Sequence, residues 1–155
     1  MKALIVYTSL SGNTKDLAEL INYNLVRCGF EVHVSSAKEL SNPSDYDVVF
    51  IGSYTWGSGE LPVVIRKYLK HFLVENKVKF PMCAVFGTGE TQFGLNNYCR
   101  AVDELKYHLS KHTRVLNTFK IEQNPIGKED QVKSFIETTM EEMQNEITSC
   151  EIINT

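Results

Sequence analysis

The sequence predicts an α/β protein built on an open, doubly wound parallel sheet, and two observations support this. Short apolar segments rich in β-branched residues alternate about five times with segments whose apolar residues recur at helical spacing. Several of the apolar segments show no polar alternation, which indicates strands covered on both faces. Parallel strands joined by right-handed helical crossovers place helices on both faces of the sheet.

The expected strands cover Lys2–Thr8, Phe30–Ser35, Asp47–Gly52, Phe80–Phe86 and Thr113–Ile121. The second alternates with the polar residues Glu31 and His33, so we place it at a sheet edge. The first helix is expected to end at Cys28-Gly29, and Pro62 suits the first turn of the second.

The bulk properties favour one domain. The chain has 155 residues and a net charge of −3, and we predict a single domain over residues 1–148 with a frayed tail over residues 149–155. No apolar run is long enough to cross a bilayer, and the N-terminal run lacks a signal-peptide cleavage site, so we expect a cytoplasmic protein. The negative charge argues against nucleic acid as a partner. Basic residues do gather at Arg66, Lys67, Lys70, Lys77 and Lys79, which we interpret as a solvated helix face and loop.

The four cysteines form no C-x-x-C pair and no zinc-binding pattern with the histidines, so no metal site is predicted. Their wide spacing favours reduced thiols. We expect Cys28, Cys83 and Cys99 to be small buried hydrophobic residues, and Cys150 to be exposed in a polar tail.

The loop after the first strand favours an anion site. Ligands in such sheets bind outside the carboxyl ends of the strands, where the strand order reverses. The segment from Thr8 to Thr14 precedes a helix N-terminus, which offers free amides and partial positive charge. Gly12 permits close backbone approach, and Ser9 and Ser11 add hydroxyl groups. The loop matches neither a Walker loop nor a dinucleotide turn. It is a phosphate cradle without a lysine, or an ordinary capped helix start.

The loop after the third strand contains the only tryptophan, Trp56, between polar residues and glycines. A tryptophan in a polar loop usually covers another group, and a flat heterocyclic ring would fit. The alternative is that Trp56 plugs the end of the sheet. Gly57 tolerates positive φ, so the Gly57–Ser58 peptide can change its orientation at low cost.

The loop after the fourth strand, residues 87–94, has two glycines that allow backbone groups to face the edge of a ligand. Phe93 offers a second aromatic plane. A glycine-rich turn with Phe93 packed on its own helix explains the same residues equally well.

Together these motifs resemble the flavodoxin family. KALIVYTSLSGNT, GSYTWGSGELP and GTGETQF…YCRAVDEL follow the family's order, and no long insertion interrupts the fifth strand, as in short-chain members. The resemblance implies a sheet of order 2-1-3-4-5 and a non-covalently bound FMN. It further implies a monomeric, low-potential one-electron carrier between a flavodoxin/ferredoxin reductase-type donor and an acceptor protein, with no substrate turnover.

The resemblance also implies roles for individual residues. The FMN phosphate would be held by Ser9, Leu10, Ser11, Gly12, Asn13 and Thr14. The ring would be met by Tyr54, Thr55, Trp56, Gly57, Ser58, Gly87, Thr88, Gly89, Glu90 and Phe93. Trp56 would stack on the inner face, and the Gly57–Ser58 carbonyl would turn toward flavin N5–H when one electron is added, which favours that state. Nearby acidic residues would disfavour the fully reduced anion.

Two departures from the family pattern and three alternatives remain. Ser58 stands where many members carry Asp, so we expect a less negative lowest potential; the outer stacking residue is Phe93, Leu95 or absent.

An NAD(P)H-dependent quinone reductase would need room for a second ring, and the chain has no second nucleotide motif. An activator of ribonucleotide reductase would have different flavin loops. A phosphate-accepting receiver domain would need aspartates at the strand ends, which the first and third strands lack.

Overall fold

The computed structural model describes residues 1–57 and 59–154, and it confirms the predicted sheet. Five parallel strands lie in the order β2-β1-β3-β4-β5. They are β1 (Lys2–Tyr7), β2 (Glu31–Ser36), β3 (Val48–Tyr54), β4 (Met82–Gly89) and β5 (Val115–Glu122). As predicted, β2 is an edge strand. Both β3 and β4 extend further at their carboxyl ends than expected, because Ser53, Gly87 and Thr88 still pair in the β3–β4 ladder.

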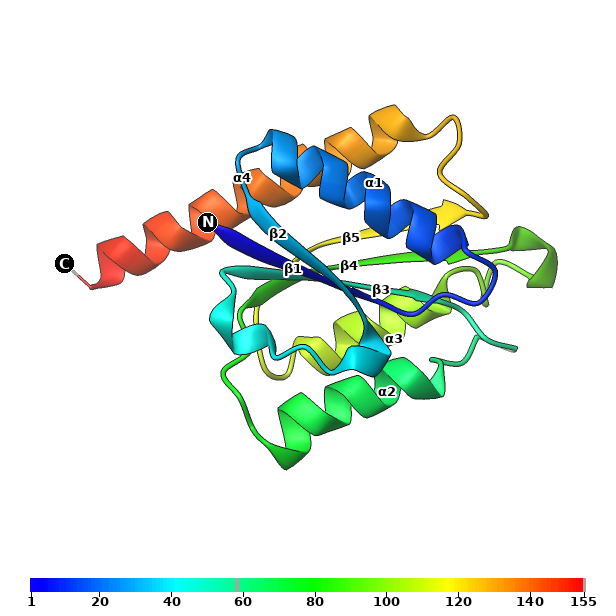
Figure 1. Cartoon of the computed structure of the whole chain (residues 1–155), viewed down its shortest axis with the longest axis horizontal. Helices are drawn as coiled ribbons and strands as arrows, with labels where there is room; N and C mark the ends of the chain where they lie inside the picture. The colour runs from blue at the N-terminus through cyan, green and yellow to red at the C-terminus, as the bar shows by residue number, and fades with distance from the viewer. Residues whose placement is uncertain (58, 155) are drawn as a thin grey trace.

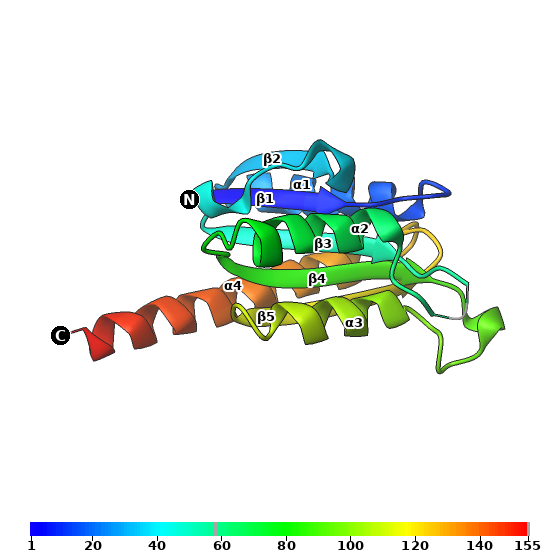
Figure 2. The same ribbon diagram turned by 90° about the horizontal axis from the view of Figure 1, so that it is seen from below.

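Helices cover both faces of the sheet (Figures 1 and 2). One face carries α1 (Asn13–Arg27) and α4 (Glu129–Ile153), and the other carries α2 (Val63–Leu69) and α3 (Arg100–Leu109). Short helical segments complete the chain at Ala37–Glu39, Pro43–Asp45, Lys70–Glu75 and Thr91–Phe93.

The alternating direction of strand side chains divides the core into two layers. In β1, Ala3 and Ile5 face α1 and α4, whereas Leu4 and Val6 face α2 and α3. All four are fully buried. This two-sided burial is why the strand sequences read as unbroken apolar runs.

The ends of two helices differ from the sequence prediction. The prediction that Cys28 is buried is wrong, because it caps the C-terminus of α1, where the chain turns at Gly29 (φ 91°), and it faces solvent. The prediction is confirmed for Cys83 and Cys99, which are buried, and for Cys150, which is exposed. Helix α4 continues to Ile153, beyond the predicted end at residue 148, and projects from the domain (Figure 1). Fraying of residues 149–155 stays a prediction.

Helix α2 continues directly into a π-helical segment, Lys70–Glu75. The sequence pattern did not predict this segment. The wider turn keeps Leu69, Phe72 and Leu73 on the buried side. None of the helices in the described part of the chain combines the length and apolar character needed to cross a membrane.

Candidate functional site

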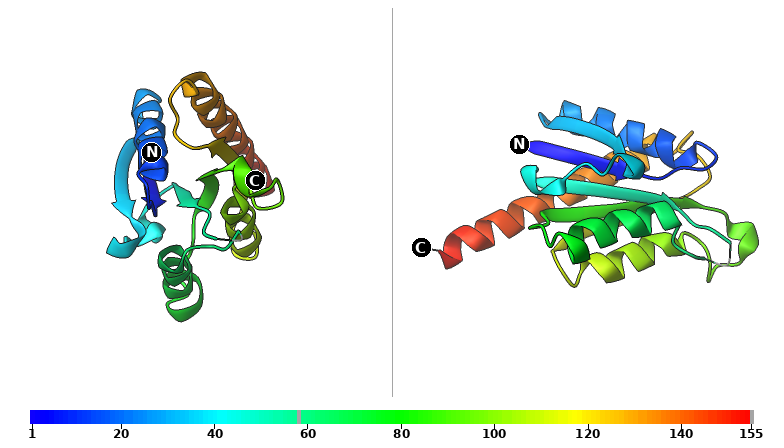
Figure 3. Two further views of the ribbon diagram at one scale, coloured as in Figure 1. Left: turned by 90° about the vertical axis from the view of Figure 1, so that its right-hand side faces the viewer. Right: turned by 60° about the horizontal axis from the view of Figure 1, so that its bottom comes forward.

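A cavity of about 220 Å³ opens at the carboxyl ends of β1, β3 and β4, where the strand order reverses. The three loops singled out from the sequence meet there, at the edge of the sheet opposite the two chain ends (Figure 3). The cavity is lined by Leu10, Ser11, Asn13, Tyr54, Thr55, Gly57, Thr88, Gly89, Glu90 and Asn97. Segments far apart in sequence therefore form one concave site.

The Ser9 side chain shapes the first loop by accepting hydrogen bonds from two nearby backbone amides. Ser9 Oγ accepts hydrogen bonds from the amides of Gly12, at 3.1 Å, and Lys15, at 3.3 Å. Gly12 has φ 97°, and a Cβ placed there would meet nothing within 4 Å, so open space lies in front of the turn. The amides of Asn13 and Thr14, at the start of α1, find no acceptor among the described residues. This end of the site therefore presents donors suited to an anion.

A buried hydroxyl pair connects the first loop with the end of β4. Thr14 Oγ1 and Thr88 Oγ1 lie 2.8 Å apart, and either can be the donor. Thr14 is 1% exposed and Thr88 is 3% exposed. Because the bond is shielded from water, it fixes α1 against β4 at the floor of the site.

The second loop is a small turn closed by backbone hydrogen bonds. The amide of Trp56 donates to the Glu60 carbonyl at 2.9 Å, and the Glu60 amide returns a bond of 2.7 Å to the Trp56 carbonyl. Gly57, inside this turn, has φ 50°, as the sequence predicts for a position that needs glycine. Ser58 lies outside the described residues. The Gly59 amide also donates to the Trp56 carbonyl, at 3.0 Å, so the turn is closed by backbone bonds to Trp56 from both Gly59 and Glu60.

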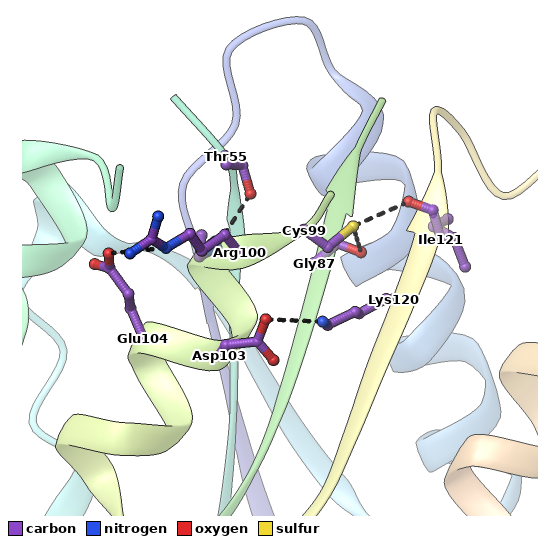
Figure 4. A network of polar contacts seen from close by, with 9 residues as sticks. Thr55, Gly87, Cys99, Arg100, Asp103, Glu104, Lys120 and Ile121 are labelled. Atoms are coloured by element: carbon purple, nitrogen blue, oxygen red, sulfur yellow. Dashed lines mark hydrogen bonds and ion pairs between the residues drawn. The ribbon is translucent and has the colours of Figure 1, made fainter. Parts of the chain in front are cut away.

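The aromatic and hydroxyl groups of this loop have different environments. Trp56 is 52% exposed and does not line the cavity, so it does not plug the sheet as a core residue. Its ring stands edge-on to Tyr54, with ring centroids 6.3 Å apart. Thr55 instead contacts α3. Its Oγ1 accepts a hydrogen bond of 3.2 Å from the Ala101 amide and so caps that helix (Figure 4).

The two glycines after β4 permit close packing of α3. A Cβ at Gly87 would lie 2.4 Å from Val102, and one at Gly89 would lie 2.8 Å from the backbone nitrogen of Cys99. Cys99 itself is fully buried, and its Sγ contacts the carbonyl oxygens of Gly87 and Ile121 (Figure 4). Burial raises the pKa of the Cys99 thiol to about 11, so it stays protonated at neutral pH.

The third loop is fastened to the end of β5. Glu122 Oε1 accepts a hydrogen bond of 2.6 Å from the Thr91 hydroxyl and one of 3.4 Å from its amide. The Gln123 amide adds a bond of 2.9 Å to the Gly89 carbonyl. Because the Thr91 bonds favour the ionised carboxylate, they hold the pKa of Glu122 below its ordinary value. We call these contacts the Glu122 clasp.

The geometry agrees with comparisons of the whole chain. The flavodoxin family model matches residues 5–135. "Probable flavodoxin 2" of Bacillus subtilis is 36% identical over 135 residues, which cover 84% of this chain and 87% of that protein. The crystal structure of oxidised Flavodoxin 2 from Bacillus cereus superimposes with a TM-score of 0.78 at 32% identity, covering 91% of this chain and 99% of the other.

The chain belongs to the flavodoxin family. The "Flavodoxin" of Maridesulfovibrio salexigens, 29% identical over 130 residues, extends the likeness to another organism. The function is accordingly that of a flavodoxin, an electron-carrying flavoprotein. The predicted family and fold are confirmed.

The flavodoxin fold brings most of the predicted site residues to the cavity, with several behind it. Of those predicted residues that do not line it, Ser9, Gly12 and Thr14 shape the first loop, and Gly87 lies beneath α3. For Phe93 the structure describes the backbone but not the side chain.

Sequence reasoning missed two residues of the site, Asn97 and Glu122, and the capping role of the predicted residue Thr55. Asn97 lines the cavity from the segment just before α3. The sequence pattern in that segment predicted only a helix. Thr55 acts as a helix cap and Glu122 as a clasp, and each joins residues distant in sequence. The only local signal for Asn97 is the adjacent pair Asn96-Asn97, two residues after Gly94.

Proposed function

We propose that this flavodoxin binds FMN non-covalently in the cavity between its three loops and carries single electrons. The observation that supports this most is the juxtaposition of two unlike features at one sheet edge. Acceptor-free amides at the start of α1 lie at one end, and a glycine-containing loop with an exposed tryptophan lies beside the other. FMN has an anionic phosphate at one end and a flat ring at the other.

The donor set of the first loop fits a phosphate. Asn13 and Thr14 offer backbone amides at a helix N-terminus, where partial positive charge favours an anion. The Ser11 side chain is exposed at the cavity and its hydroxyl can donate. Phosphate binding here needs no lysine from the loop, because the partial positive charge of the amides attracts the phosphate. Ser9 keeps the turn in shape, and its own hydroxyl proton remains available to the ligand.

The other loops fit the ring of a flavin. Pockets for small ligands usually have volumes of roughly 300–1,000 Å³. The volume of this cavity is smaller, and the cavity is open to solvent. A ring placed there is only partly enclosed, as electron exchange with a partner protein requires. Trp56, half exposed, is available to cover one face, and Tyr54, Thr88, Gly89 and Glu90 stand along the cavity.

FMN supplies a ring that accepts electrons one at a time, and the chain adjusts how tightly each redox state is held. Gly57, which precedes Ser58 in the sequence, lies inside the turn that the Trp56–Glu60 bonds close. A carbonyl there can reorient toward a ring proton without disturbing those bonds. Glu90 places a carboxyl group at the cavity, which disfavours added negative charge. Ser58, in place of a charged residue, weakens that effect.

We further propose that the protein works as a single-domain monomer in the cytoplasm. Its partners are a flavodoxin/ferredoxin reductase-type donor and a redox acceptor protein. It is a carrier, with no substrate turned over at the site.

Titration with three flavins tests the proposal. Because Trp56 is the only tryptophan, its fluorescence reports ring binding directly. We expect FMN to quench it and to bind at least ~100-fold more tightly than riboflavin, since two or three charge-assisted hydrogen bonds are each worth about 1.5–3 kcal/mol. FAD should bind poorly. Equal affinity for FMN and riboflavin would refute the phosphate cradle, and a single two-electron step in a potentiometric titration would refute the one-electron carrier.

A further inference from the structure

A second concave surface lies between α2, the π-helical segment Lys70–Glu75 and α3, on the face of the sheet away from α1 and α4. The two helices run side by side there (Figure 2). The groove has a volume of about 320 Å³. It contains part of the basic cluster noted in the sequence, which the cofactor site does not use.

The floor of the groove is apolar. Leu61, Leu69 and Leu73 form it and are 2%, 6% and 7% exposed. Val74 stands beside them and is 57% exposed, an apolar side chain without a cover. Such a floor gains free energy when another apolar surface displaces its water.

The rim of the groove is basic. Arg66 and Lys70 approach from the α2 side, and Lys111 approaches from just beyond the end of α3. The imidazoles of His108 and His112 complete the lining, and none of the lining residues is acidic. The Glu75 carboxylate lies 4.0 Å from the Lys70 ammonium with both side chains exposed, so this ion pair neutralises little of the positive charge on the rim. Lys111 lies over the Tyr107 ring, 4.1 Å from its centroid.

We propose that this groove docks an acidic, amphipathic segment of a partner protein. Leucine-type side chains of the segment would meet the floor, and its carboxylates would meet Arg66, Lys70 and Lys111. Local positive charge on a chain of net charge −3 gives a directional field that orients an acidic partner.

The position of the groove suits a redox partner, and in this respect the inference rests on the proposed function. Leu61 directly follows the turn closed by Trp56 and Glu60. A segment seated on Leu61 therefore begins at the base of the loop that flanks the cofactor cavity.

A second copy of this chain is the competing occupant. The end of α4 has no basic residue in its last turn and exposes Ile152 and Ile153 at 69% and 82%. A copy bound through α4 would make a head-to-tail contact, which tends to continue into open chains. The experiment must therefore include the association state.

The test uses a fluorescent peptide helix with leucines on one face and glutamates beside them, and a matched peptide with lysines in place of the glutamates. The protein is titrated with and without added FMN, at low and at physiological salt, and chemical shifts of ¹⁵N-labelled protein locate the contact. We expect the acidic peptide to bind, the basic one not to, and shifts to cluster on residues 61–74 and 108–112.

Two charge-reversed variants isolate the role of the rim. Lys70→Glu/Lys111→Glu removes one weak ion pair and one cation–π contact from the groove. The control Arg27→Glu/Lys133→Glu also removes one cation–π contact and one weak ion pair, but on the opposite face of the sheet, and it changes the net charge by the same amount. The groove variant should weaken the peptide at least ~10-fold and the control less than about twofold, with the difference shrinking as salt rises.

Some outcomes would overturn the inference. Equal weakening by both variants would mean a general charge effect, and shifts elsewhere would place the contact outside the groove. Concentration-dependent self-association abolished by truncation before Ile152 would make α4 of a second copy the occupant. FMN affinity is measured on the same samples, so an intact cofactor site with no peptide binding rejects the docking proposal alone. Peptide binding without FMN binding rejects the proposed function alone.

Discussion

The first and second loops border the same cavity but are held in opposite ways. In the first, Ser9 Oγ binds two amides within the loop, and Thr14 is tied to β4 through a buried hydroxyl pair. In the second, the turn is closed by backbone bonds that join Trp56 to Gly59 and Glu60. The difference suggests a division of labour. The preorganised first loop provides affinity, because little ordering is needed on binding, and the second provides adjustability between redox states.

The largest effect is expected from Gly12→Val. Gly12 has φ 97°, which a β-branched residue adopts only with strain, although no neighbour lies within 4 Å. The turn should deform, and FMN affinity should fall by at least ~100-fold, with riboflavin affinity little changed. Gly29→Val is the matched control, because Gly29 has φ 91° with equally open surroundings at the far end of α1. If both variants lose FMN affinity equally, general destabilisation rather than the phosphate loop is responsible.

Ser9→Ala should have the next largest effect. It removes the acceptor for the Gly12 and Lys15 amides without changing the backbone preference. Loss of a side-chain cap of this kind costs about 1 kcal/mol, so we expect roughly a fivefold weaker FMN affinity in a fluorescence titration. Ser44→Ala serves as a comparison, since Ser44 lies in a surface turn at Pro43–Asp45. An unchanged affinity in Ser9→Ala would contradict the idea that the first loop is preorganised.

Gly57→Ala sharpens the comparison from the side of the second loop. Alanine at φ 50° costs roughly 1 kcal/mol in backbone strain, and a tenfold change corresponds to 59 mV for one electron. We therefore expect the gap between the two one-electron potentials to change by roughly 40 mV, with FMN affinity of the oxidised protein altered only a few-fold. A large loss of affinity with an unchanged gap would assign this loop to binding instead of redox adjustment.

The smallest effect is expected from the Glu122 clasp, and it depends on pH. Bonds from Thr91 lower the pKa of Glu122 below the ordinary 4.5, so the clasp stabilises the third loop above that pH. Its contribution is lost as pH falls through the lowered pKa. Glu122→Gln should raise the FMN dissociation rate about twofold at neutral pH and remove the corresponding acid-dependent step. Stopped-flow measurements from pH 3 to 7 check this, and an unchanged acid step in the variant would show that another group is responsible.

The fold was predictable because its signal is local and repeated. Each buried strand is an unbroken apolar run, and the glycines after β1, β3 and β4 mark the loops that converge at the switch point. The contacts that refine the site were not predictable, because they join residues far apart in sequence. Thr55 caps α3 at Ala101, and Glu122 meets Thr91.

Other errors arose from element ends. A cysteine at the end of an amphipathic helix matches a buried position in the pattern. Cys28 is nevertheless exposed, because it lies at the C-cap, where the chain leaves the helix and turns at Gly29. The π-helical turn at Lys70–Glu75 shifts side chains by one position relative to an α-helix, and the apolar spacing alone does not reveal it.

The strand order has a consequence for how the protein reaches its working state. Every ladder joins segments separated by at least a helix or a strand: Leu4 pairs with both His33 and Val49, and Val49 pairs with Cys83. Such non-local pairing makes a chain fold slowly, because large loops must close before any ladder forms. The cavity needs the ends of β1, β3 and β4 together, so it is completed only late in folding. A chain still emerging from the ribosome cannot present the cavity until β4 has docked, which places cofactor capture after synthesis of more than half the sequence.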